Sequence, residues 1–212
     1  MTMRKLFAVL ATLVIAVAAF AQTPEEILDK MEQVMNAHEA EGLIMTVNMK
    51  IPILGTMSTR GWTLGQKSKM VTTTMGVQII IWTDEALGTT WTYDSKNNKI
   101  KIENIDLSEA KEDGGDAEMF SGVADGYDVS IKKETDKEWH ILAKKQKTNL
   151  EKDAPKTMEV VVAKGTYYPL SLSAKMDGIT ITMKDLVFGV TEADVTFNQA
   201  NYPNATVEDK RQ

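Results

Sequence analysis

A long series of short, regularly alternating segments constrains the fold of this chain more than any other feature. Apolar and polar residues alternate along these segments, which are rich in Thr, Val, Ile and Trp, and Gly, Pro and Asn punctuate the series. Period-two alternation is typical of strands that bury one face. It predicts an antiparallel meander of ten or eleven strands, at 43–50, 56–64, 67–75, 77–84, 89–94, 99–104, 127–133, 139–146, 157–164, 168–176 and 179–187.

One amphipathic helix precedes the strands. Thr23 is suited to cap it, Pro24 to occupy its first position, and Glu26 to complete a capping box. The apolar residues that follow recur with helical spacing, which predicts a helix ending near Ala40 with an apolar face that must pack on another element. These residues are Ile27, Leu28, Met31, Val34 and Met35.

The N-terminus has the pattern of a secretory signal peptide. Two basic residues, Arg4 and Lys5, precede an apolar run that closes with Ala19-Phe20-Ala21. The run is short for a membrane span and ends in a small-x-small cleavage pattern. We expect cleavage after Ala21, although an uncleaved anchor is the alternative, and we expect residues 22–212 to form one domain.

Composition excludes several classes of protein. The net charge of −6 argues against nucleic acid or an anionic membrane surface as the main partner. The chain has no cysteine and only two histidines, so a disulfide scaffold and a zinc cluster are not expected. No nucleophile elbow, phosphate loop or histidine triad is present. We therefore predict no catalytic residue, metal or cofactor, and place His140 on the surface of a strand.

Residues 106–126 interrupt the meander. A run of carboxylates, a Gly114-Gly115 hinge and an apolar tip made of Met119, Phe120 and Val123 follow one another. Long insertions of this kind are often functional lids, and a plain crossover with Met119 and Phe120 in the core is the equal alternative. The carboxylates lack the spacing of a calcium loop, and a solvated loop is the simplest interpretation. They are Asp106, Glu109, Glu112, Asp113 and Asp116.

Methionine and tryptophan are the basis for predicting an apolar cavity. The chain has 13 methionines and four tryptophans, and methionine suits surfaces that accept varied apolar ligands. A curved sheet, an apolar helix face and a lid together favour a cavity, while filling of a single core is the alternative. The expected lining and lid residues are Trp62, Met70, Trp82, Trp91, Met119, Phe120 and Val123.

Four stretches resemble the periplasmic lipoprotein carrier family of the Lol outer-membrane sorting pathway (LolA). Residues 24–30 resemble the opening helix of that family, and residues 61–67 resemble the strand pair after it. Residues 82–93 are similar to its "D-G-x-x-x-W-x-Y" hairpin. The end of the chain, from Val195 to Arg211, is similar to its closing "F-x-F…P-x-x-x-x-V-x-D-x-R" motif. The order and spacing of the four stretches match across almost the whole mature chain.

This resemblance implies an unclosed antiparallel β-barrel whose mouth is covered by helices. It implies a periplasmic carrier that holds lipoprotein acyl chains in a hydrophobic cavity and moves them from the inner to the outer membrane. The partners would be an inner-membrane release complex and an outer-membrane acceptor, and the protein would be a monomer. The alternatives are a non-enzymatic sensor or protein-interaction module on the same fold and, less favoured, a hydrolase using the acidic loop.

The chain departs from the family at the lid latch. Well-known members have an arginine beside a proline after the second strand, where this chain has Leu64-Gly65-Gln66-Lys67. Arg60 and Lys67 are the candidates for a replacement latch, or the latch is absent. For Lys67 we favour an ordinary solvated lysine.

Overall fold

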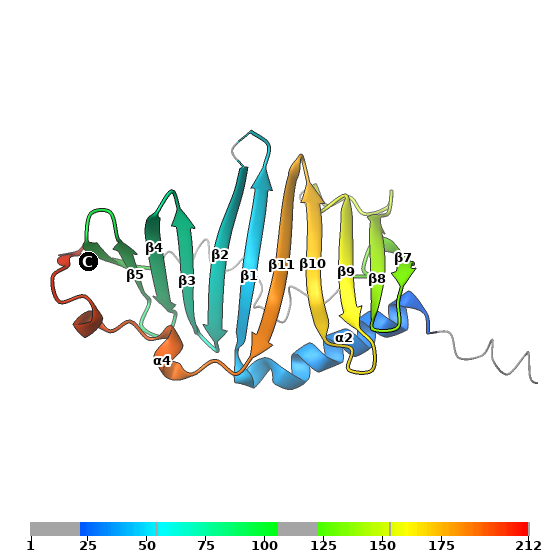
Figure 1. Cartoon of the computed structure of the whole chain (residues 1–212), viewed down its shortest axis with the longest axis horizontal. Helices are drawn as coiled ribbons and strands as arrows, with labels where there is room; N and C mark the ends of the chain where they lie inside the picture. The colour runs from blue at the N-terminus through cyan, green and yellow to red at the C-terminus, as the bar shows by residue number, and fades with distance from the viewer. Residues whose placement is uncertain (1–21, 54, 106–122, 153, 212) are drawn as a thin grey trace, which may run out of the picture.

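The protein is built on a single open sheet of twelve strands, seen in a computed structural model (Figure 1). The structure describes residues 22–53, 55–105, 123–152 and 154–211. The strand order is β12-β6-β5-β4-β3-β2-β1-β11-β10-β9-β8-β7, and every pairing is antiparallel except that of β12 with β6. The strands are β1 (Leu43–Ile51), β2 (Gly55–Leu64), β3 (Lys67–Thr74), β4 (Val77–Asp84), β5 (Thr89–Asp94), β6 (Lys99–Asn104), β7 (Tyr127–Glu134), β8 (Glu138–Lys145), β9 (Thr157–Ala163), β10 (Pro169–Met176), β11 (Ile179–Phe188) and β12 (Thr206–Asp209).

The predicted fold class is confirmed, with one strand more than expected. All eleven predicted strands exist, and their ends differ from the prediction by one residue or less. The additional strand is β12, which pairs in parallel with β6 at the sheet edge, opposite Lys99–Ile102. Its four residues, Thr-Val-Glu-Asp, are too few and too polar to show a strand pattern, and only the neighbouring edge stabilises them as a strand.

The N-terminal helix α2 (Pro24–His38) begins as the sequence predicts. The Thr23 side chain accepts a hydrogen bond from the Glu26 amide, and the Glu26 carboxylate accepts one from the Thr23 amide. This reciprocal capping satisfies two amides that have no partner within the helix. A short 3₁₀ turn, η1 (Glu39–Glu41), follows α2 and leads into β1.

Gly42 makes the connection from η1 to β1 possible. Its φ is +70°, and a Cβ atom there would lie 2.4 Å from the Thr63 carbonyl oxygen. Only glycine fits such a close approach of two backbones in this conformation. The helix is thereby folded back beneath the strands that follow it.

The main core lies between α2 and half of the sheet (Figure 1). Ile27, Leu28, Met31 and Met35 of the helix are buried against apolar side chains of β1 and β7 to β11. We call the sheet face that α2 covers the inner face, and the opposite one the outer face. Strand alternation and register assign residues to these faces: Leu43, Met45 and Val47 of β1 share the inner face with Val160 of β9 and Ile141 of β8.

The C-terminal segment covers the outer face at the other half of the sheet. It consists of α4 (Glu192–Val195), η2 (Gln199–Asn201) and β12, and it carries Phe197 and Tyr202. The Phe197 ring stacks on Trp91 with a centroid distance of 5.6 Å and meets Trp82 edge-on at 5.3 Å. The sheet therefore has two covered regions on opposite faces, one under α2 and one under the C-terminal segment. Within the described residues, no helix is long and apolar enough to cross a membrane.

Candidate functional site

An apolar strip lies on the inner face beyond the main core. Among the described residues, the buried core cluster under α2 does not extend to β2, β3 or β4. Apolar residues nevertheless recur on this part of the inner face, on both sides of the hydrogen-bonded pair Thr59 and Thr72, and Met57 and Met70 are 41% and 42% exposed. We define the apolar strip as Val47, Met49, Met57, Met70, Ile79 and Ile81.

Register shows why these side chains share one face of the sheet. Met49 pairs with Met57 across β1 and β2, and Met70 pairs with Ile81 across β3 and β4. Directly paired residues of antiparallel strands present their side chains on the same face. Methionine is flexible and polarisable, so such a surface adapts to apolar partners of different shape.

Gly61 leaves open space in the middle of the strip. It lies on the inner face, opposite Met45 on one side and Met70 on the other. The residue is buried, yet no described heavy atom lies within 4 Å of a Cβ built on it. Its backbone is not in the positive-φ region that demands glycine. Gly61 therefore leaves open space at the position where any other residue would carry its Cβ atom.

The four aromatic and methionine residues predicted to line the cavity do not lie on one face. Met70 belongs to the apolar strip on the inner face. Trp62, Trp82 and Trp91 lie on the outer face, because Trp62 and Trp82 both pair with Lys69, and Trp91 pairs with Trp82. The structure thus separates the tryptophans from Met70, and acyl binding by any of them stays a prediction.

The outer-face tryptophans already have partners in the described structure. Trp82 is 4% exposed beneath the C-terminal segment. The guanidinium of Arg60 and the ammonium of Lys69 lie 5.3 and 5.0 Å from the Trp62 ring. Cations at this distance are attracted to an aromatic face. Arg60, a candidate lid latch, thus contacts an aromatic ring on the outer face.

Lys67, the other candidate latch, joins the C-terminal segment to the sheet. Its ammonium forms an ion pair with Glu192 of α4 and lies 3.6 Å from the Asp84 carboxylate. The hydrogen bond with Glu192, with the charges of both carboxylates, raises the pKa of Lys67 above its ordinary value. Lys67 thus has carboxylate partners at the surface of the sheet, and its role as a lid latch stays a prediction. The pairing joins residues 125 positions apart, which the sequence pattern did not reveal.

The predicted lid lies mostly outside the described residues. Met119 and Phe120 belong to the range 106–122, outside the described residues. Val123 is described, and it is 5% exposed in the core cluster that contains α2. Its contacts are those of a core residue at the end of the insertion, and its participation in a lid is untested.

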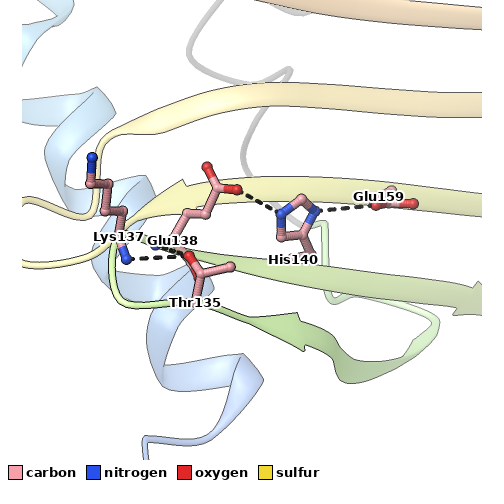
Figure 2. A network of polar contacts seen from close by, with 5 residues as sticks. All are labelled: Thr135, Lys137, Glu138, His140 and Glu159. Atoms are coloured by element: carbon pink, nitrogen blue, oxygen red, sulfur yellow. Dashed lines mark hydrogen bonds and ion pairs between the residues drawn. The ribbon is translucent and has the colours of Figure 1, made fainter.

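His140 lies in a network of polar side chains on the outer face of β8 (Figure 2). Its Nε2 atom is 2.9 Å from Glu138, and its Nδ1 atom is 3.4 Å from Glu159. Lys132 donates a hydrogen bond to Glu159 at 2.6 Å and, with His140, lowers the pKa of that carboxyl. The position on a strand surface agrees with the prediction. Among the described residues, no group of side chains suited to hold a metal ion is present.

A hollow of about 530 Å³ lies at one end of the sheet, away from the apolar strip. The turn Asp125–Tyr127 and the loop Thr148–Glu151 line it. The Tyr127 hydroxyl donates a hydrogen bond to the Pro155 carbonyl at 2.9 Å and is thereby occupied. The hollow is wide open and offers no convergent set of reactive groups, so the apolar strip remains the stronger candidate site.

No protein-family model and no curated protein sequence matches the chain. Among solved structures, an uncharacterized conserved protein from Thermus thermophilus is 16% identical with a TM-score of 0.47, over 89% of this chain and 100% of that chain. MucB in its complex with MucA(peri) is 10% identical with a TM-score of 0.44, over 80% of this chain and 59% of that chain. A LolA superfamily protein from Nitrosomonas europaea is 10% identical with a TM-score of 0.32, over 85% of this chain and 100% of that chain. All three likenesses lie below 25% identity and below a TM-score of 0.5.

Proposed function

We propose that this protein is a non-enzymatic periplasmic carrier that binds the acyl chains of lipoproteins and moves them from the inner to the outer membrane. In this proposal residues 1–21 are removed on export and residues 22–212 form the carrier domain. An inner-membrane release complex loads it and an outer-membrane acceptor unloads it. The apolar strip, with the open space at Gly61, is the surface on which the acyl chains lie.

The partly exposed strip is the observation that supports this proposal most. Soluble proteins normally bury large apolar side chains, and an apolar surface that stays accessible favours a binding site. Six strip residues from four neighbouring strands form such a surface beside the core, and the space at Gly61 gives it depth. Each acyl methylene removed from water contributes about 0.8 kcal/mol. A strip of this kind therefore holds a chain without requiring any polar contact.

A fluorescent acyl probe tests the proposal. The protein should bind the probe, and the paired change Met57→Ser/Met70→Ser should weaken binding by roughly tenfold or more, because each methionine loses apolar contact. Both side chains are about two-fifths exposed, so the free energy of unfolding should change little. The matched control is Val187→Ser, because Val187 is 51% exposed and pairs with Ile44 on the outer face.

Mass spectrometry under native conditions identifies the cargo class. A carrier should co-purify with acylated peptide or lipid, and the Met57→Ser/Met70→Ser protein should carry less of it. Recovery of the protein empty, with no probe binding, would instead favour the alternative of a sensor or protein-interaction module. Equal loss of probe affinity in the Val187→Ser control would show that binding does not depend on the inner face.

A further inference from the structure

Three large apolar side chains protrude from the same end of the sheet. Ile53 is 105% exposed, Met75 is 100% exposed and Leu150 is 86% exposed, and they have the highest exposures among the large apolar residues that the structure describes. Ile53 lies in the β1–β2 connection, Met75 in the β3–β4 turn and Leu150 in the β8–β9 loop. These connections lie at the upper end of the sheet in Figure 1, opposite the end near α2 and α4. We call this the hairpin end.

The backbone at two of these positions is strained. Ile53 has a φ of +72° and Met75 a φ of +51°. Positive φ is unfavourable for residues with a Cβ atom and most unusual for a β-branched residue such as isoleucine. Glycine would satisfy both turns without strain. At each of these two positions, backbone strain and exposure of an apolar side chain both disfavour the folded state. Nearly complete exposure leaves no contact within the described structure to offset them, which indicates a contact made outside the protein.

A row of lysines crosses the outer face just below the hairpin end. Register aligns Lys50, Thr180, Lys175, Thr157 and Lys144 across β1, β11, β10, β9 and β8. All three lysines are exposed, and among the described residues none of them has a carboxylate within 4.0 Å. On β7 the register continues to Asp128, which pairs with Lys144, so the aligned positions carry three cations and one carboxylate in a chain whose net charge is −6. It is therefore a local feature that the overall charge does not predict.

We propose that the hairpin end docks on an anionic lipid bilayer, with Ile53, Met75 and Leu150 entering the interface and the lysine row contacting the headgroups. The three points lie on separate connections, and the hollow beside Leu150 is lined mainly by polar residues, so it offers no apolar groove for a protein partner. A bilayer requires no matching shape. Lysines near an anionic surface contribute about 1 kcal/mol each, and apolar side chains add their burial. The docking surface does not include the apolar strip, so this proposal is independent of acyl carriage.

Vesicle sedimentation tests the docking. The protein is used from Gln22 onward, because an apolar leader would itself enter vesicles and every described element follows it. Vesicles of phosphatidylethanolamine with phosphatidylglycerol should retain the protein, and vesicles of phosphatidylcholine should retain much less. Ile53→Gly/Met75→Gly should lower the partition coefficient roughly a hundredfold, about tenfold for each side chain. Lys50→Gln/Lys175→Gln should lower it on anionic vesicles by roughly 30-fold.

The controls separate docking from misfolding and from self-association. Glycine suits both positive-φ turns, so the tip variant should unfold at the same temperature as the wild type or higher, and should bind the acyl probe as the wild type does. The control Leu87→Ser changes a side chain that is 67% exposed in the turn between β4 and β5, at the opposite end, and should not alter vesicle binding. Equal binding to both kinds of vesicle, or an unchanged partition of the tip variant, would overturn the proposal. A wild-type dimer without lipid that the tip variant abolishes would also overturn it, in favour of contact with a second copy.

Discussion

Replacing Gly61 by leucine should change stability and ligand affinity in opposite directions. The backbone at Gly61 does not have a positive φ, and no described heavy atom lies within 4 Å of the position of its Cβ. A Cβ atom therefore fits there without strain, and we expect the exposed Met70 beside it to move aside for the rest of a leucine side chain. Loss of glycine in a strand lowers the entropy of the unfolded chain and stabilises the fold by roughly 0.5–1 kcal/mol.

The same side chain occupies the space that the acyl chain requires. Leucine adds four carbon atoms, which displace a comparable number of acyl methylenes at about 0.8 kcal/mol each. The loss is about 3 kcal/mol, which corresponds to a roughly 100-fold weaker affinity for the acyl probe. Urea unfolding measures the first effect, and probe titration measures the second.

Ser58→Leu is the matched control for this experiment. Ser58 lies three residues earlier on the same strand, is exposed, and pairs with Asn48 on the outer face. It adds the same apolar group to the opposite side of β2, so probe affinity should not change. A loss of stability in Gly61→Leu would show that the space is filled, and unchanged probe affinity in that variant would show that the ligand does not lie over Gly61.

Three further changes test the parts that hold the fold together. Thr23→Ala removes one side of the capping box and should lower the free energy of unfolding by about 1 kcal/mol in urea titrations, whereas Thr23→Ser should retain most of it. Phe197→Ala removes the ring that packs on Trp82 and Trp91 and should cost roughly 1–3 kcal/mol, with a shift of tryptophan emission to longer wavelength; unchanged emission would show that the C-terminal segment does not cover these rings. The pKa of Lys67 is raised by its Glu192 partner, so its stabilising contribution is complete below the unfolded pKa of about 10.4 and is lost as the pH rises through the higher folded pKa. The stability curves of the wild type and Lys67→Met should therefore differ at neutral pH and converge only in this alkaline range, and a constant difference across that range would contradict the pairing.

The sequence alone predicted the strands and the helix because both depend on local patterns. Alternation over six to ten residues specifies a strand, and turn signals such as Asp177-Gly178 specify where it reverses. The structure places the β10–β11 turn at those two residues, both with positive φ. The capping box at Thr23 and Glu26 is equally local, since its two partners are three residues apart. For such elements, the local sequence was sufficient to predict the secondary structure without contacts from distant parts of the chain.

The composition of the candidate site was decided by tertiary structure. Met70 and Trp82 both occupy apolar positions of predicted strands, and nothing local distinguishes the face of one from that of the other. Cross-strand register pairs Met70 with Ile81 and Trp82 with Lys69, which places them on opposite sides of one sheet. A slip of one residue would exchange the two faces, so the assignment depends on the whole set of pairings.

Long-range packing decided the remaining features in the same way. The pairing of Lys67 with Glu192 and the parallel strand β12 both join segments that are about a hundred residues apart. A short polar segment such as β12 carries no strand signal, because its hydrogen-bonding partner belongs to another part of the chain. The sequence by itself determined which elements form, because their patterns are local. Only the folded sheet determined which side chains share a face, because a strand presents both faces until a distant element covers one of them.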